Sequence, residues 1–342
     1  MSNVVPFDTR WSSLPIYLRA ALEPIQGFLA RADVVEISIN GPGRIWVETL
    51  GSSSMVVHEA ASLDVDAIRR MAQQVASETK QAVNEETPLL SAALPHGERF
   101  QAVLPPAAPN GGAISIRKQA VKDLSLAEFE RAGGLNMVRV TGDDELSDVE
   151  QELMEHLKAR KVGHFLRLAV RERVSMVISG GTSTGKTTFL NALLKEVPEE
   201  ERIVSIEDTR ELRPPQENYL PLIASKGDQG LSRVSIQDLL EASLRMRPDR
   251  LFLGEVRGAE AFSFLQAINT GHPGSMTTVH ANSPAQAYER LALMSMQAGL
   301  GLSKAEIVDY IRSVIPIIVQ LSRQGGRRGP SEIQFTKLRK VG

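Results

Sequence analysis

The chain has 342 residues, of which 42% are apolar and 23% charged, and its formal net charge is −2. This length is enough for about two domains, each with its own hydrophobic core. A net charge close to zero argues against a protein whose main task is to coat nucleic acid, and the lack of cysteine in the sequence excludes disulfides, thiolate chemistry and cysteine-based zinc sites.

The first part of the chain predicts a small α+β domain over residues 1–138. Apolar residues recur there at helical spacing in some segments and alternate with polar residues in others. The predicted elements are helices at 14–30, 66–79 and 124–132 and strands at 35–39, 45–47, 99–104 and 113–117. Gly133, Gly134 and Gly142, together with an acidic stretch, favour a linker at 139–146.

The second part, residues 147–342, predicts an α/β domain. Short apolar strands alternate there with helical segments, which is typical of a largely parallel sheet covered by helices on both faces. The predicted strands are 174–178, 202–206, 251–253 and 276–279, followed by an antiparallel pair at 315–321 and 333–335 around a turn at 325–330. The most apolar stretch, 314–321, is far shorter than a membrane span.

A phosphate-binding loop follows the first of these strands. Gly180, Gly185, Lys186 and Thr187 match the pattern G-x-x-x-x-G-K-[ST], with an apolar strand before it and a helix after it. Backbone N–H groups of such a loop cradle phosphate oxygens, the lysine reaches the β- and γ-phosphates, and the threonine hydroxyl ligates Mg²⁺. The residues expected to bind nucleotide are Gly180, Gly181, Thr182, Ser183, Thr184, Gly185, Lys186, Thr187 and Thr188. The sequence lacks the Asn-Lys-x-Asp motif of guanine recognition, so we expect ATP.

Three further candidates lie at or near the ends of predicted strands. Glu207 and Glu255 each end a strand, and His280 follows the strand 276–279. Alone, each has an ordinary structural explanation, because many strands end in glutamate and a buried histidine is more often structural than functional. Their order behind the phosphate loop makes catalytic roles the better interpretation.

Taken together, these segments resemble the hexameric secretion ATPases of type II secretion, type IV secretion and type IV pili, and most of all the traffic ATPases of VirB-type machines. The resembling motifs cover most of the chain, from residue 36 to 319. They are the phosphate loop at 180–187, an acidic box at 206–211, segments 244–249 and 251–257, a histidine box at 270–280, and segments 97–101 and 114–117 of the small domain.

The resemblance implies a RecA-like ATPase domain and a role for each candidate. Glu207 would polarise the attacking water and Glu255 would hold Mg²⁺ through water, although the reverse assignment stays open. His280 would sense the γ-phosphate. Arg99 and Arg117, from the small domain, would act as arginine fingers, because a planar guanidinium suits phosphate oxygens.

The chain departs from the family's loop at one position that bears on its chemistry. Ser183 stands where the family usually has glycine. If the loop requires a positive φ there, serine carries a strain cost that glycine does not.

The function implied by the resemblance is ATP hydrolysis that powers substrate export, pilus assembly or both in a type IV secretion system. The expected partners are five further copies in a homohexamer, inner-membrane components of the system, and an exported protein or DNA–protein substrate. The expected location is the cytoplasm, at the inner-membrane periphery. Two alternatives stay open: a nucleic-acid translocase or helicase on a related ring, and a scaffold that binds nucleotide but scarcely hydrolyses it.

Overall fold

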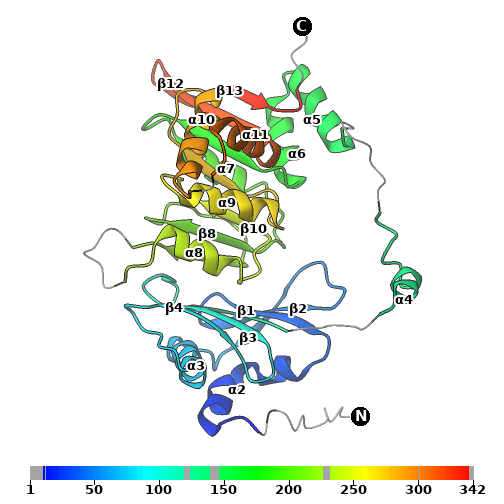
Figure 1. Cartoon of the computed structure of the whole chain (residues 1–342), viewed down its shortest axis with the longest axis vertical. Coiled ribbons are helices and arrows are strands. Elements are labelled where there is room, and N and C mark those ends of the chain that lie inside the picture. The colour runs from blue at the N-terminus through cyan, green and yellow to red at the C-terminus, as the bar shows by residue number, and fades with distance from the viewer. Residues whose placement is uncertain are drawn as a thin grey trace.

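The computed structural model describes residue 11 and residues 13–118, 124–138, 146–225, 232–299 and 301–338. Two β-sheets, one from each part of the chain, lie one above the other in Figure 1. The predicted linker at 139–146 lies outside the described residues except for its last residue, and Gly142 lies outside them too. None of the described helices has the length and apolar character needed to span a bilayer.

The amino-terminal sheet is six-stranded and antiparallel throughout, in the order β3-β2-β1-β6-β5-β4. Two helices pack on it through apolar stripes, as their spacing predicts. The elements are α2 (Ile16–Ala30), β1 (Val34–Ile39), β2 (Gly43–Thr49), β3 (Val56–Ala60), α3 (Val65–Glu78), β4 (Leu89–Ala93), β5 (Arg99–Val103) and β6 (Ala113–Arg117). Within this sheet, the sequence did not predict β3 and β4, the edge strands, which are only partly buried and so lack a strong apolar alternation.

A short helix, α4 (Leu126–Arg131), lies between the two sheets in the sequence and buries none of its residues. Its start is fixed by a capping box in which Ser125 and Glu128 each accept a backbone N–H of the other. Figure 1 shows it beside both sheets and apart from them.

The second sheet has seven strands in the order β13-β12-β7-β11-β10-β8-β9, and all neighbours are parallel except β12 and β13. One face packs on α5, α6 and α7, and the other on α8 to α11, so the predicted parallel sheet with two covered faces is confirmed. The strands are β7 (Met176–Gly180), β8 (Ile203–Glu207), β9 (Tyr219–Ile223), β10 (Arg250–Leu253), β11 (Met276–Val279), β12 (Ile317–Gln324) and β13 (Arg327–Phe335). The helices are α5 (Asp148–Lys158), α6 (Val162–Arg171), α7 (Lys186–Leu194), α8 (Ile236–Ser243), α9 (Glu260–Asn269), α10 (Pro284–Met296) and α11 (Lys304–Val314).

The closing hairpin is longer than predicted. Its turn consists of Gly325 and Gly326 alone, both at positive φ (54° and 81°), and β13 begins directly afterwards. Two residues at positive φ match the twist of a two-residue hairpin. The sequence pattern hid this extension because residues 327–330 are mostly arginine, glycine and proline, which do not signal a strand.

A buried polar cluster joins the two sheets. Arg202, just before β8, is fully buried, and its Nη1 donates to Asn40 Oδ1 at 2.8 Å and to Asn218 Oδ1 at 2.6 Å. Nearby, Arg247 Nε lies 2.7 Å from Glu48 Oε2, a contact between β2 and the segment before β10. These contacts fix the amino-terminal sheet beside the β8–β9 side of the second sheet.

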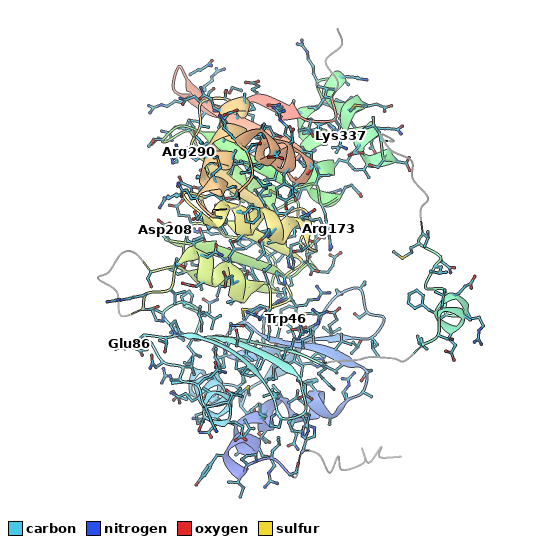
Figure 2. All side chains as sticks on the ribbon, in the orientation of Figure 1. Trp46, Glu86, Arg173, Asp208, Arg290 and Lys337 are labelled. Carbon is cyan, nitrogen blue, oxygen red and sulfur yellow. The ribbon has the colours of Figure 1, made fainter. Side chains whose placement is uncertain are left out.

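The outer strand β9 is also covered by the small domain. The Ile223 N–H donates to the carbonyl of Ala107 at 2.8 Å. Trp46, on β2, is buried and lies on the side of the small domain that faces the second sheet (Figure 2).

Glu36, on β1, is the carboxyl group most affected by this burial. It is 2% exposed, its Oε1 has no hydrogen-bond partner, and burial raises its pKa from 4.5 to about 7 against the opposing charges of Arg202 and Arg117. A folded-state pKa above the unfolded one means that the native state binds the proton more tightly. Stability contributed by this group is therefore fullest below about pH 4.5 and is lost as the pH rises to about 7.

We expect Glu36→Gln to remove this pH dependence. The parent's free energy of unfolding should fall between pH 5 and pH 8 by up to about 3 kcal/mol from this group, whereas the variant, which has no proton to lose, should fall less. Denaturant unfolding at the two pH values measures the difference. At pH 5, where Glu36 is largely protonated, the two proteins should have nearly equal free energies of unfolding. If the free energy of unfolding falls by the same amount in both proteins between pH 5 and pH 8, the assignment is wrong.

Candidate functional site

The phosphate loop connects β7 to α7, as the sequence predicts. Gly185 is the N-cap of α7 at φ +92°, and the Thr184 hydroxyl donates to the Gly181 carbonyl at 2.9 Å. A Cβ on Gly180 would lie 2.5 Å from Thr184 Oγ1, so only glycine fits there. The loop and the start of α7 line one cavity, and N–H groups at a helix start are the groups that bind phosphate.

Ser183 has a φ of +60°. The position thus requires the left-handed conformation, and serine occupies it in place of the family's usual glycine at a cost of about 1 kcal/mol. The positive φ on which the predicted strain depends is therefore present at this position.

Lys186 points back along the loop. Its Nζ donates to the carbonyls of Gly180 at 3.0 Å and Gly181 at 3.1 Å, and it lies 3.4 Å from each ring nitrogen of His280. Burial lowers its pKa, while the nearby charge of Glu255 acts in the opposite sense. The ammonium group is therefore held at the base of the loop.

These groups line a pocket of about 490 Å³. It brings together most of the predicted site residues, from four separate segments of the second domain. Its lining consists of Thr182, Ser183, Thr184, Gly185, Lys186, Thr187, Thr188, Glu207, Asp208, Thr209, Glu211, Gly254, Glu255, Arg257, Thr278, His280 and Arg328.

Glu207 is the buried carboxylate of the pocket. Its Oε1 accepts the backbone N–H groups of Glu211 at 2.9 Å and Leu212 at 3.0 Å, which fixes the side chain and shapes the loop after β8. Burial raises its pKa, and these two hydrogen bonds oppose the rise. A fixed carboxylate with a raised pKa is suited to accept a proton.

Glu255 is surrounded by cations and a histidine. Arg257 Nη2 lies 2.8 Å from Glu255 Oε2, and its Nη1 lies 2.8 Å from Asp208 Oδ2. His280 Nε2 lies 3.1 Å from Glu255 Oε1. Burial and the charge of Lys186 lower the pKa of His280, while the charge of Glu255 acts in the opposite sense.

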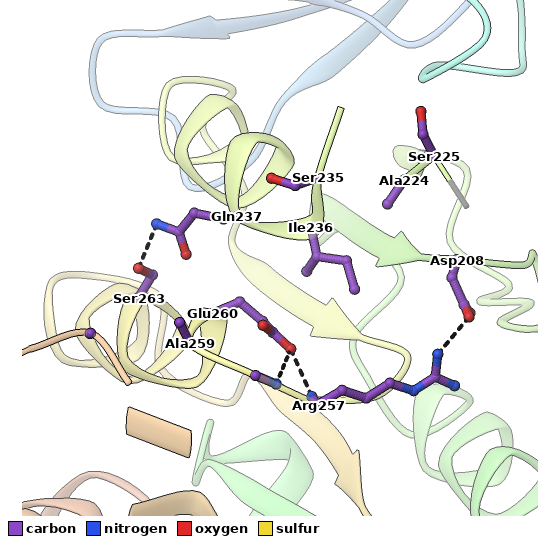
Figure 3. Close-up of a pocket in the computed structure, with 12 residues that line it drawn as sticks. Asp208, Ala224, Ser225, Ser235, Ile236, Gln237, Arg257, Ala259, Glu260 and Ser263 are labelled. Atoms are coloured by element: carbon purple, nitrogen blue, oxygen red, sulfur yellow. Dashed lines mark hydrogen bonds and ion pairs between the residues drawn. The ribbon is translucent and has the colours of Figure 1, made fainter. Parts of the chain in front are cut away.

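A second cavity, of about 870 Å³, adjoins this pocket and shares Asp208 and Arg257 with it. Figure 3 shows the Arg257–Asp208 ion pair at its edge, with Glu260 accepting the Arg257 backbone N–H. The ion pair therefore lies where the two cavities meet.

Arg99 and Arg117 do not line the phosphate-loop pocket. They are register partners on β5 and β6, and Arg99 lines a separate pocket of about 220 Å³ with Arg245 from the segment after α8. That segment leads into the start of β10, whereas the phosphate loop follows the end of β7. A contact between these arginines and phosphates at the loop needs either a rotation of the small domain or the loop of another copy.

Seven residues of the pocket lining had no predicted role: Asp208, Thr209, Glu211, Gly254, Arg257, Thr278 and Arg328. All but Arg328 lie within the segments quoted for the family, so their position was a usable signal. Arg328 lies on β13, far from the other motifs in the sequence, and only the pairing of β12 with β7 brings it to the loop.

Comparison with known proteins places this geometry in context. A family profile described as "Type II/IV secretion system protein" matches residues 19–325. The chain is 38% identical over 327 residues to a type IV secretion system protein VirB11 of Bartonella quintana, which covers 92% of this chain and 91% of that protein. It is also 38% identical over 347 residues to the type IV secretion system protein PtlH of Bordetella pertussis, which covers 98% of each.

The fold is similar to a solved structure as well. The VirB11 ATPase from the Brucella suis type IV secretion system, crystallised in complex with sulphate, superimposes with a TM-score of 0.87 at 32% identity. The match covers 94% of this chain and 99% of that one. The similarity therefore extends over both sheets.

Proposed function

The chain belongs to the type II/IV secretion system protein family, and from this premise we propose that it hydrolyses ATP to power a type IV secretion system. The observation that carries the proposal is the pocket in which the phosphate loop, two carboxylates and a histidine converge. The relatives named above are type IV secretion proteins, and none of them supports the nucleic-acid translocase hypothesis.

The residues of the pocket fit Mg·ATP. The loop residues and the first turn of α7 line the pocket, where backbone N–H groups suit phosphate oxygens, and Lys186 supplies a positive charge beside them. Thr187 and Glu255 bring a hydroxyl and a carboxylate oxygen into the same pocket, the oxygen donors that Mg²⁺ prefers. When bound, the metal neutralises charge on the phosphates.

We assign different tasks to the two glutamates. Glu207 has a raised pKa and one carboxylate oxygen fixed by two N–H groups, which supports its role as the residue that orients water and accepts its proton. Glu255 lies 2.8 Å from Arg257 and lines the same pocket as Thr187, which supports its role toward the metal. His280 links Glu255 to Lys186 and is placed to respond to the γ-phosphate.

The test is ATP turnover by the parent chain and by matched amide variants. We expect the parent to release phosphate in the presence of Mg²⁺, and Glu207→Gln and Glu255→Gln each to lower kcat by about 10²-fold while nucleotide binding is retained. Glu207→Gln should also lose the decline of kcat at acid pH, because the proton acceptor is gone. Glu255→Gln should instead raise the Mg²⁺ concentration needed for half-maximal activity. Normal turnover in both variants, or a parent that binds ATP without hydrolysing it, would contradict the proposal.

The assembly we propose is a homohexamer at the cytoplasmic face of the inner membrane, where it engages membrane components of the secretion system and an exported protein or DNA–protein substrate. The proposed domains are 1–138 and 147–342, joined by the segment 139–146. In this assembly Arg99 and Arg117 reach the phosphates of a neighbouring copy. This agrees with their position on the small domain, outside the pocket formed by the chain's own phosphate loop.

A further inference from the structure

The carboxyl-terminal hairpin lies directly beside the phosphate loop. Its first strand, β12, pairs in parallel with β7, and Leu321 is the register partner of Gly180, the residue at which the loop begins. A Cβ on Gly180 would lie 3.0 Å from the Leu321 carbonyl oxygen. The strand then continues past the point where β7 ends, so the hairpin projects on the side of the sheet that holds the loop.

Arg328 is the residue of this hairpin that meets the loop. A Cβ on Gly185, the N-cap of α7, would lie 3.9 Å from Arg328 Cβ. Arg328 lines the phosphate-loop pocket and also a second pocket of about 470 Å³ on the hairpin itself. Arg328 thus belongs to the wall of the cavity in which phosphates are expected.

Arg328 differs from the other cations of the pocket in its partners. Arg257 is held by Asp208 and Glu255, and Lys186 by two loop carbonyls. Within the described part of the chain, no hydrogen bond or ion pair involves the side chain of Arg328, which is exposed to solvent. Its guanidinium is therefore available to an incoming anion.

The register of the hairpin adds a reason for an anion to bind. Arg323 is the cross-strand partner of Arg328, so two arginine side chains start from directly opposed positions near the tip. Like charges in directly opposed positions destabilise a strand pair. A phosphate beside them would relieve the repulsion, and a guanidinium can bind its oxygens in a bidentate manner.

We propose that Arg328 is a phosphate-binding residue that holds the polyphosphate chain of the nucleotide from the hairpin side, opposite Lys186. The proposal rests on the nucleotide site assigned above. Because such a contact forms with both ADP and ATP, it contributes binding to the ground state and the transition state alike, and its loss raises KM with little change in kcat.

The experiment compares two neighbouring arginines. Arg328→Ala should raise the KM for ATP and the Kd for ADP about tenfold, the scale of one charge-assisted hydrogen bond at a partly solvated site. Arg327→Ala removes the same charge from the same strand, is also exposed, and lines only the hairpin pocket. Arg327→Ala should change the KM for ATP and the Kd for ADP by no more than about twofold from the parent's values. Arg328→Lys should restore part of the ADP affinity, since it keeps the charge but loses the bidentate geometry.

The outcomes separate this inference from the proposed function. If the parent binds ADP and hydrolyses ATP while Arg328→Ala retains the parent's constants, Arg328 does not bind phosphate. If both alanine variants weaken ADP binding equally, the loss comes from the long-range attraction between positive charge and ADP, and the inference is also wrong. If the parent itself binds no ADP, the nucleotide site and the proposed function fail together. Thermal unfolding of each variant, expected to match the parent, confirms that an exposed side chain was changed without loss of the fold.

Discussion

Lys186→Ala is expected to lower ATP turnover by about 10³-fold or more, to below detection in an ordinary phosphate-release assay. The lysine is the only ammonium group in the part of the pocket that the structure describes, and it lies at the base of the loop between two carbonyls and His280. Phosphoryl transfer depends on positioning and charge neutralisation, so no neighbouring group replaces it.

The matched control is Lys195→Ala. Lys195 is the C-cap of the same helix, α7, and is exposed at its far end. It should retain parent turnover. Because Lys186 also holds the carbonyls of Gly180 and Gly181, a thermal melt must accompany the assay. If a folded Lys186→Ala protein hydrolyses ATP at near the parent's rate, the assignment of the hydrolytic site to this loop is wrong.

Arg117→Ala is expected to lower turnover by roughly 10³-fold in the assembled protein, the lower end of what an arginine finger contributes. The residue is exposed and lies opposite Arg99 on the small domain, with no place in the chain's own phosphate pocket. Arg69→Ala, an exposed arginine on α3 that pairs with Asp66, is the control and should have little effect. If the assembled Arg117→Ala protein hydrolyses ATP at the parent's rate, Arg117 is not an arginine finger.

Mixing variants then locates the contact. If Arg117 acts on a neighbouring copy, hexamers assembled from Lys186→Ala and Arg117→Ala chains contain some sites with both groups intact and regain part of the activity. If the small domain instead rotates onto its own loop, every site in the mixture lacks one group, and activity stays absent. Native mass of the mixture confirms that mixed assemblies formed.

The sequence predicted those parts of the fold and site whose signals are local. The phosphate loop is a single contiguous segment, and β7, β8 and β11 are short apolar runs, so these were found close to their observed bounds. The buried parallel strand β9 was not predicted. Glu207 and Glu255 followed from their place at strand ends. Edge strands such as β4 were missed because half-buried residues do not need strong β-forming side chains.

What the sequence could not supply is the set of contacts made by tertiary pairing. Arg328 reaches the loop only because β12 lies next to β7, and Arg257 is shared by Asp208 and Glu255 only because the ends of β8 and β10 are adjacent. The orientation of Arg99 and Arg117 depends on how the small domain sits beside β9. A linear pattern identifies these residues as candidates but carries no information about the direction in which they face.

The two outer strands of the large sheet have a consequence for crowded assemblies. Open strand edges are templates for edge-to-edge aggregation. On one side, the Ile223 N–H of β9 is already taken by Ala107 of the small domain. On the other, β13 carries arginines, Pro330 and a bulge opposite Gln320 and Leu321, all of which disfavour the addition of another strand. Many copies can thus be packed together and meet through their side chains, while the continuous sheet growth that leads to fibres is disfavoured at both edges.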